Sequence, residues 1–112
     1  MAVSPEMLKG TVVPIILKLL SEKEMYGYEM IQVVHERTER VLEWKEGTLY
    51  PWLHSLEQDG LITSTWRESE AGRRRKYYAI TPRGLTALTQ KIDEWQTLAK
   101  AVSAVLSLPC PA

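Results

Sequence analysis

Apolar residues near the C-terminus follow a heptad pattern, and this pattern constrains the fold more than any other feature of the sequence. Thr81-Pro82 is typical of a helix start and Pro109 of a helix end, so we expect one helix of about 25 residues and about 37 Å between them. Apolar side chains recur along it at alternating spacings of three and four residues, at Leu85, Leu88, Ile92, Trp95, Ala99, Val102 and Leu106. A stripe this narrow is typical of a helix that packs against a partner helix, so these residues predict a dimer interface.

Hydrophobic periodicity predicts two helices in the first part of the chain. The first is expected over residues 4–20, where apolar residues recur at helical spacing. Pro14 falls inside it, so either the helix kinks at Pro14 or Thr11 restarts it with Pro14 in the new first turn. The second helix is expected over residues 26–39, with Tyr28 on its apolar face.

A third helix and a β-hairpin follow. The helix is expected over residues 48–59, with Thr48 as its N-cap. Residues 61–67 and 74–80 are rich in Thr, Ile, Trp and Tyr, which predicts two strands joined by a turn. Trp66, in the first of these strands, is expected in the core.

Length and composition exclude several classes of protein. A chain of 112 residues suits one domain, and its single cysteine, Cys110, excludes an intramolecular disulfide and a cysteine-based metal site. No apolar stretch is long enough to span a membrane and no secretory signal is visible, so we expect a cytoplasmic protein with no membrane partner. No catalytic set, Gly-rich phosphate loop or metal-ligand spacing occurs, so we expect no enzyme, cofactor or metal.

The charges are unevenly distributed although the formal net charge is zero. Residues 1–65 carry six Lys or Arg against ten Asp or Glu, whereas residues 66–84 carry six against two. At the expected hairpin turn stand four consecutive basic residues, Arg73, Arg74, Arg75 and Lys76. Such a run can neutralise DNA phosphates and release counterions, and the alternative is a charged hairpin that is merely solvated.

Three helices, a hairpin and a final long helix are the element order of a winged helix-turn-helix. In that fold the third helix enters the DNA major groove and the hairpin, called the wing, touches the adjacent backbone. The sequence therefore predicts a mainly α fold with a small β-hairpin. Residues 1–81 are expected to form a DNA-binding domain, and residues 82–112 a dimerisation helix with a short tail.

Four motifs give the chain a resemblance to a known family. In chain order they are Leu8-Lys9-Gly10-Thr11, Tyr26-Gly27-Tyr28-Glu29, Glu46-Gly47-Thr48-Leu49-Tyr50-Pro51 followed by Leu56-Glu57-Gln58-Asp59-Gly60-Leu61-Ile62, and Gly72-Arg73-Arg74-Arg75-Lys76-Tyr77-Tyr78-Ala79-Ile80-Thr81-Pro82-Arg83-Gly84. With these motifs in this order, nearly the whole chain resembles the PadR family of transcriptional regulators in its short form. The resemblance implies a homodimeric repressor that binds an inverted repeat in double-stranded DNA and dimerises mainly through its last helix. Members of the family commonly release DNA when a small aromatic or amphipathic ligand binds.

Carried over by position, the resemblance implies which residues meet DNA. The groove-facing candidates on the third helix are Thr48, Tyr50, Pro51, His54 and Ser55. The wing candidates are the basic run at residues 73–76. Three further residues match positions that resemble backbone-contacting residues in the family, namely Lys9, Thr11 and Tyr28. For Tyr28 and Tyr50 the alternative is partial core packing with the hydroxyl at the surface.

Trp95 stands at mid-length of the heptad stripe, where two copies in a symmetric dimer would face each other. Its position resembles that of a tryptophan that lines a drug pore in some multidrug-responsive PadR proteins, which implies a site for a small planar aromatic effector. The expected lining residues are Trp95, Ile92, Ala99, Leu8 and Val12. The alternative is that the two indoles simply fill the interface.

Two other functions compete with a DNA-binding regulator. One is a protein-interaction module in which the winged helix is structural, although such a module has no need of the basic run at the hairpin. The other is a ligand-binding dimer with secondary DNA binding, which predicts saturable quenching of tryptophan fluorescence by planar compounds.

Overall fold

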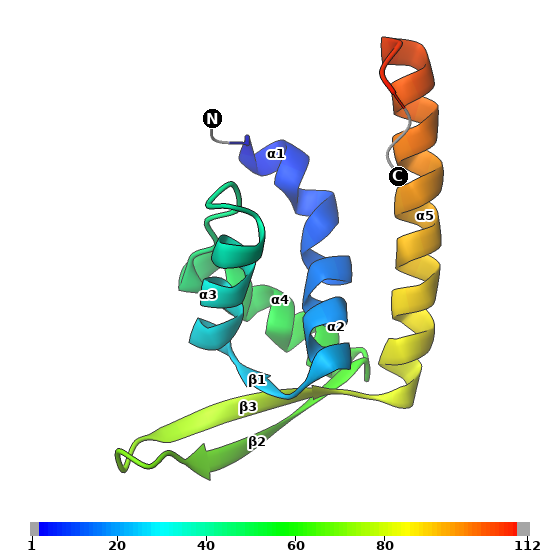
Figure 1. Ribbon diagram of the computed structural model, residues 1–112. Helices are drawn as coiled ribbons and strands as arrows, with labels where there is room; N and C mark the ends of the chain where they lie inside the picture. The colour runs from blue at the N-terminus through cyan, green and yellow to red at the C-terminus, as the bar shows by residue number, and fades with distance from the viewer. Residues whose placement is uncertain (1–2, 110–112) are drawn as a thin grey trace.

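A computed structural model describes residues 3–109 of the chain (Figure 1). Its elements, in chain order, are α1 (Pro5–Leu8), the 3-10 turn η1 (Lys9–Thr11), α2 (Val12–Glu22), β1 (Met25–Tyr26), α3 (Gly27–Arg37), α4 (Glu46–Gln58), β2 (Ile62–Glu68), β3 (Arg74–Ile80) and α5 (Pro82–Leu106). The expected mainly α fold, with a hairpin and a long C-terminal helix, is confirmed.

Pro14 lies in the first turn of α2, so the helix restarts and does not kink. α1 is a single turn capped by Ser4, whose Oγ accepts a hydrogen bond from the Met7 N–H at 3.4 Å. The turn η1 then separates α1 from α2, which begins at Val12 with Thr11 in the N-cap position. In a first turn the missing proline N–H costs no helical hydrogen bond, which favours the restart over a kink.

The apolar face of α3 is set by Gly27, Met30 and Val34, which are buried. Tyr28 lies beside this stripe with 52% of its surface exposed, so the expectation that Tyr28 belongs to the apolar face is wrong. A glycine carries no apolar side chain, so periodicity could not show that the stripe passes through position 27.

α4 begins at Glu46, three residues earlier than a helix with Thr48 as its N-cap would begin, so Thr48 is not its cap. Lys45 occupies the N-cap position without a side-chain hydrogen bond. The first turn closes through the backbone instead, because the Thr48 N–H donates to the Lys45 carbonyl oxygen at 3.0 Å. The expected N-cap role of Thr48 is wrong, since the helix needs no side-chain cap to begin earlier.

Strands β1, β3 and β2 form an antiparallel sheet in that spatial order. β2 and β3 pair over their whole length, out to Glu68 opposite Arg74. β1 adds only two rungs, of which Tyr26 opposite Tyr77 is the outer one. A two-residue strand carries too little pattern to be recognised in a sequence. The outer part of the hairpin therefore has only two strands, and it projects away from the helices (Figure 1).

Alternate residues of the hairpin face the helices, and the depth of their burial falls toward the tip. Ile62 and Tyr78 are buried in the core. Trp66 lies on the same face four residues beyond Ile62, but 57% of its surface is exposed. The expectation that Trp66 belongs to the core is wrong, because the helices cover this rung only in part: the opposite residue, Lys76, is half-buried while Trp66 is exposed.

The core lies between α2, α3, α4 and the inner end of the sheet. Its largest fully buried side chains are Ile16, Leu17, Met25, Met30, Leu49, Leu53 and Ile62. Trp44, with 6% of its surface exposed, packs into this core just ahead of α4. The indole thus anchors the segment that leads into that helix.

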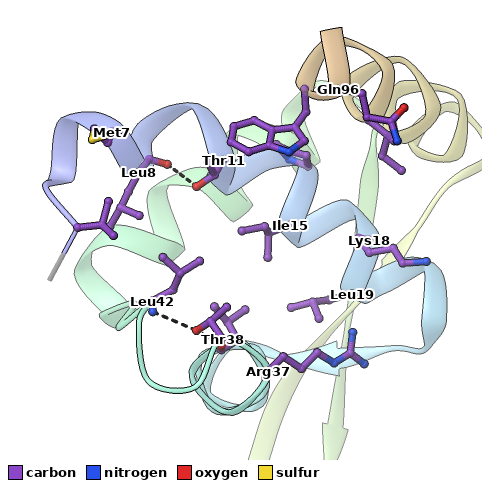
Figure 2. A pocket seen from close by; sticks show the side chains of 15 residues that line it. Met7, Leu8, Thr11, Ile15, Lys18, Leu19, Arg37, Thr38, Leu42 and Gln96 are labelled. Atoms are coloured by element: carbon purple, nitrogen blue, oxygen red, sulfur yellow. Dashed lines mark hydrogen bonds between the residues drawn. The ribbon is translucent and has the colours of Figure 1, made fainter. Parts of the chain in front are cut away.

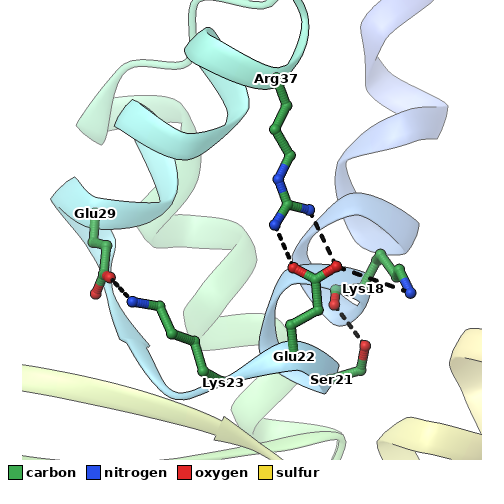
Figure 3. Close-up of polar contacts among 6 residues, drawn as sticks. All are labelled: Lys18, Ser21, Glu22, Lys23, Glu29 and Arg37. Atoms are coloured by element: carbon green, nitrogen blue, oxygen red, sulfur yellow. Dashed lines mark hydrogen bonds and ion pairs between the residues drawn. The ribbon is translucent and has the colours of Figure 1, made fainter.

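Ion pairs at the surface join α2 to α3 (Figure 3). The Arg37 guanidinium donates to both carboxylate oxygens of Glu22, at 3.1 and 2.5 Å. This hydrogen bonding lowers the pKa of Glu22 and raises the pKa of Arg37. Nearby, Lys23 Nζ lies 2.6 Å from Glu29 Oε2, and this contact raises the pKa of Lys23.

α5 spans Pro82–Leu106, as the sequence predicts. Thr81 caps it, because its Oγ1 accepts a hydrogen bond from the Gly84 N–H at 3.0 Å and donates to the Gly60 carbonyl oxygen at 2.7 Å. Leu88 is buried against the core, and the C-terminal end of the helix extends past the other helices (Figure 1). The Cα radius of gyration is 15.4 Å, against about 13 Å for a compact domain of this length. Part of α5 thus lies outside the core.

Candidate nucleic-acid interface

One side of α4 is exposed over its whole length. Leu49, Leu53 and Leu56 turn into the core. On the other side, four of the expected groove-facing residues are exposed, namely Thr48, Pro51, His54 and Ser55. Positions 48, 51 and 55 are three and four residues apart, so they share one face of the helix. A major groove about 12 Å wide admits one helix with such a face.

Tyr50, the fifth residue expected on this face, packs partly against α3. Its surface is 41% exposed, and its hydroxyl oxygen would lie 2.7 Å from a Cβ added at Gly27. Burial raises the pKa of the Tyr50 phenol, and the nearby Glu46 carboxylate raises it further. The hydroxyl is therefore directed toward α3 and stays protonated at neutral pH, while the rest of the side chain remains partly exposed.

The turn between β2 and β3 forms a compact basic tip. The Ser69 N–H donates to the Arg73 carbonyl oxygen at 2.6 Å, and the Gly72 N–H donates to the Ser69 carbonyl oxygen at 2.9 Å. Gly72 has a φ of +80°, a conformation that favours glycine. Arg73 and Arg74 are exposed at this tip, with the Arg74 guanidinium 5.3 Å from the centre of the Trp66 ring.

Arg75 and Lys76 are half-buried and have partners nearer the base of the hairpin. The Arg75 guanidinium lies 4.4 Å from the centre of the Tyr26 ring. Lys76 Nζ lies 3.8 Å from Glu57 Oε1 of α4. The other oxygen of Glu57 accepts a hydrogen bond from Ser64 Oγ at 2.5 Å, so Glu57 joins α4 to the hairpin. The sequence did not indicate these contacts, because they depend on which strand residues face α4; strand alternation is the signal that could have suggested them.

Lys9 and Thr11 lie apart from the wing. Both belong to η1, at the end of α2 remote from the sheet (Figure 1). The Thr11 hydroxyl donates to the Leu8 carbonyl oxygen at 2.7 Å. Tyr28 is exposed at the start of α3. The structure therefore does not join Lys9 and Thr11 to the wing in one surface.

The heptad stripe of α5 is largely uncovered. Leu88 is buried and Ala99 is half-buried. The other five members are exposed by 41–60% of their surface, and they are Leu85, Ile92, Trp95, Val102 and Leu106. A row of large apolar side chains along one helix is a typical surface for contact with another protein chain.

An apolar pocket of about 590 Å³ lies between the N-terminal helices, the end of α3 and α5 (Figure 2). Three of the residues expected to meet an effector, Trp95, Ile92 and Leu8, line this pocket. Ala99 and Val12 do not line it, and Val12 is buried in the core. Val12 was expected there as a residue of the first helix, but its side chain is buried in the core, so this expectation is wrong.

Within residues 3–109, no three His, Cys, Asp or Glu side chains are grouped to hold a metal ion. Cys110 lies outside the described residues. In the same part of the chain, no helix has both the length and the apolar character needed to cross a membrane.

Comparison with known proteins finds matches over most of the chain. Residues 16–90 match the family described as Transcriptional regulator PadR-like. The protein named Transcriptional regulator Rv3488, from Mycobacterium tuberculosis, is 39% identical over 87 residues, which cover 78% of each chain.

Solved structures agree with this match. A transcriptional regulator from Clostridium thermocellum is 37% identical with a TM-score of 0.82, over 88% of this chain and 96% of that one. A PadR-like transcriptional regulator from Bacillus cereus is 34% identical with a TM-score of 0.77, over 90% of this chain and 96% of that one. Family match, relatives and fold all agree, and the chain belongs to the PadR-like family of transcriptional regulators.

Proposed function

We propose that this chain is a repressor that binds an inverted repeat in double-stranded DNA as a homodimer. α4 enters the major groove through Thr48, Pro51, His54 and Ser55, beside the partly packed Tyr50. Arg73 and Arg74 of the wing meet the adjacent phosphates. Membership of a family of transcriptional regulators supports a role on DNA, and with it the expected cytoplasmic location.

One observation carries this proposal: the helix with the exposed face, α4, contacts the hairpin that carries the exposed arginine tip. Glu57 of α4 accepts a hydrogen bond from Ser64 at 2.5 Å and lies 3.8 Å from Lys76, and both partners are in the hairpin. A helix and a wing held at a fixed offset can engage a groove and the neighbouring backbone together.

The uncovered stripe of α5 supports the homodimer. Trp95, Val102 and Leu106 are exposed by 51%, 46% and 60% of their surface, and burial of such side chains between two chains is favourable. A two-fold axis then relates two copies of α4, so the half-sites form an inverted repeat about one helical turn apart.

A small planar aromatic effector would fit the apolar pocket. Trp95 and Ile92 bring α5 to one wall, and Leu8 and Ile15 supply apolar surface from the N-terminal helices. A ligand there contacts the helix that carries the dimer stripe, so its binding can favour a different dimer geometry and release DNA. Trp95 belongs both to the pocket and to the stripe. Its indole can therefore either stack on a ligand in the pocket or fill the dimer interface.

A binding selection from random duplex DNA tests the proposal. We expect the selected sequences to share an inverted repeat, and we expect Ser55→Ala to change the preferred bases. Lys100→Ala, at an exposed position of α5, is the matched control and should leave the preference unchanged. A selection that enriches no sequence contradicts the proposal and favours a protein-interaction module, whereas a single unrepeated site contradicts the homodimer.

A further inference from the structure

Four side chains gather on the outer face of the sheet, the face turned away from α4. The inner face is identified by Ser64 and Lys76, which contact Glu57 of α4. Side chains alternate between the two faces along a strand, so the odd-numbered residues of β2 and of β3 point to the opposite face. We call the residues gathered there the outer-face cluster, which comprises Tyr26 of β1, Arg67 of β2, and Arg75 and Tyr77 of β3.

Aromatic and cationic contacts hold the outer-face cluster together. The Tyr26 and Tyr77 rings meet edge to face, with centroids 5.5 Å apart and planes at 73°. The Arg75 guanidinium lies 4.4 Å from the centre of the Tyr26 ring, and that of Arg67 lies 5.0 Å from the centre of the Tyr77 ring. Arg67 also pairs with Glu24, in the connection between α2 and β1.

These contacts bridge the point where the sheet loses its third strand. The last rung that includes β1 pairs Tyr26 with Tyr77, and the rung that pairs Arg67 with Arg75 lies farther out on the hairpin. A two-stranded hairpin is marginally stable by itself in water. The two arginines reach back from the unsupported part of the wing to Tyr26, Tyr77 and Glu24, which tie it to the body of the protein.

We infer that the outer-face cluster positions the wing, and that Arg75 acts through Tyr26 and not on a DNA phosphate. This inference rests on the proposed function, because it divides the wing arginines into two roles. Arg73 and Arg74 are exposed at the tip and are the phosphate contacts. Arg75 is half-buried on the face away from α4, and a phosphate contact would draw its guanidinium off the Tyr26 ring.

The salt dependence of DNA affinity separates the two roles, because each lost phosphate contact lowers the log–log slope by about 0.9. The variants Arg75→Gln and Tyr26→Leu should bind the preferred duplex about threefold to tenfold more weakly, with unchanged slope. Tyr26→Phe keeps the ring and should keep the affinity. Arg73→Gln is the contact control and should lower the slope by about 0.9 for each protomer. A similar loss of slope in Arg75→Gln would overturn the inference.

Hydrogen exchange of the free protein tests the positioning role without DNA. Backbone amides of the three rungs from Tyr77 outward to Arg75 should exchange faster in Tyr26→Leu and in Glu24→Gln. They should not exchange faster in Tyr26→Phe. Unchanged exchange in Tyr26→Leu and Glu24→Gln would overturn the inference. Failure of the unaltered chain to bind any DNA would refute the proposed function, and the exchange measurement would still decide whether the cluster holds the wing.

Discussion

Gly84 and Gly27 lie in helices, where glycine is usually unfavourable. In the structure, a different neighbour limits the room for a side chain at each position. A Cβ at Gly84 would stand 2.1 Å from the Leu61 backbone carbonyl oxygen. A Cβ at Gly27 would stand 2.7 Å from the Tyr50 hydroxyl, which belongs to a side chain that can move. Periodicity could not show either contact, because both join segments far apart in the sequence.

Gly84→Ala should therefore lower the free energy of unfolding by about 2–3 kcal/mol, since backbone must shift to make room. Gly27→Ala should change it by less than about 1 kcal/mol, because displacement of Tyr50 is offset by better helix propensity. Urea unfolding followed by circular dichroism measures both. Gly47→Ala is the control, because a Cβ there meets nothing within 4 Å. Equal effects of Gly84→Ala and Gly47→Ala would contradict this account.

Tyr50 and Tyr78 should make stability fall in alkaline solution. Burial is the main cause that raises the pKa of each phenol. Unfolded tyrosine ionises at about pH 10, so above that pH the unfolded chain loses protons that the folded chain keeps. The contribution of the two protonated phenols to the free energy of unfolding is present below about pH 10, and it is lost as the pH rises through the pKa values of the folded state.

Urea unfolding at pH 9 and at pH 11 checks this prediction. Tyr50→Phe cannot ionise at that position, so its stability should fall less than that of the unaltered chain. Spectroscopic titration should detect phenolates that form only above about pH 10 in the folded protein. In the urea-unfolded chain, all tyrosines should ionise at about pH 10. An identical alkaline loss in Tyr50→Phe would show that Tyr50 makes no contribution.

Among the elements, those with local signals were predictable from the sequence and those set by distant contacts were not. α5 begins and ends where Thr81-Pro82 and the heptad pattern place it. β1 was missed because its two residues become a strand only by pairing with β3. Trp66 was misplaced because its exposure depends on where the hairpin leaves the helices. The exposed face of α4 was expected, but the partners of Arg75 and Lys76 required the register of β2 and β3.

The hydrogen bond from Ser64 of the wing to Glu57 of α4, which we call the joint, should contribute to stability. Ser64→Ala removes the hydroxyl that donates to Glu57 at 2.5 Å, and it should lower the free energy of unfolding by about 1–2 kcal/mol. Ser55→Ala is the control on α4, at an exposed position where we expect a change within about 0.5 kcal/mol. Urea unfolding measures both, and equal values would mean that the joint adds no stability.

Across the whole molecule, the apolar stripe in the C-terminal half of α5 is the surface that the proposed homodimer would cover. The sequence predicted this stripe because a heptad pattern is readable in one chain, but it could not show which members the protomer's own core covers. Leu88 is buried while Val102 is 46% exposed. The pocket beside Trp95 was only partly predictable, because Val12 and Trp95 differ in burial although both fit the apolar pattern.

Val102→Glu should weaken or abolish the proposed dimer, because it places a charge in the exposed apolar stripe that we propose as its interface. Ala101→Glu is the matched control, since Ala101 is exposed and lies outside the heptad stripe. Sedimentation velocity should show a monomer for Val102→Glu and a dimer for the control and the unaltered chain. A monomer for the unaltered chain, or no difference between the two variants, would contradict the proposed interface.

The central claim is that α4 and the wing bind double-stranded DNA with a sequence preference. Fluorescence anisotropy tests it most directly, with the duplex that the binding selection enriches and a scrambled duplex of equal length. We expect tighter binding to the selected duplex, with an affinity that falls on the order of a hundredfold between about 50 and 200 mM salt if the dimer meets about four phosphates through Arg73 and Arg74. Equal binding to both duplexes, or an affinity that salt does not change, would contradict the claim.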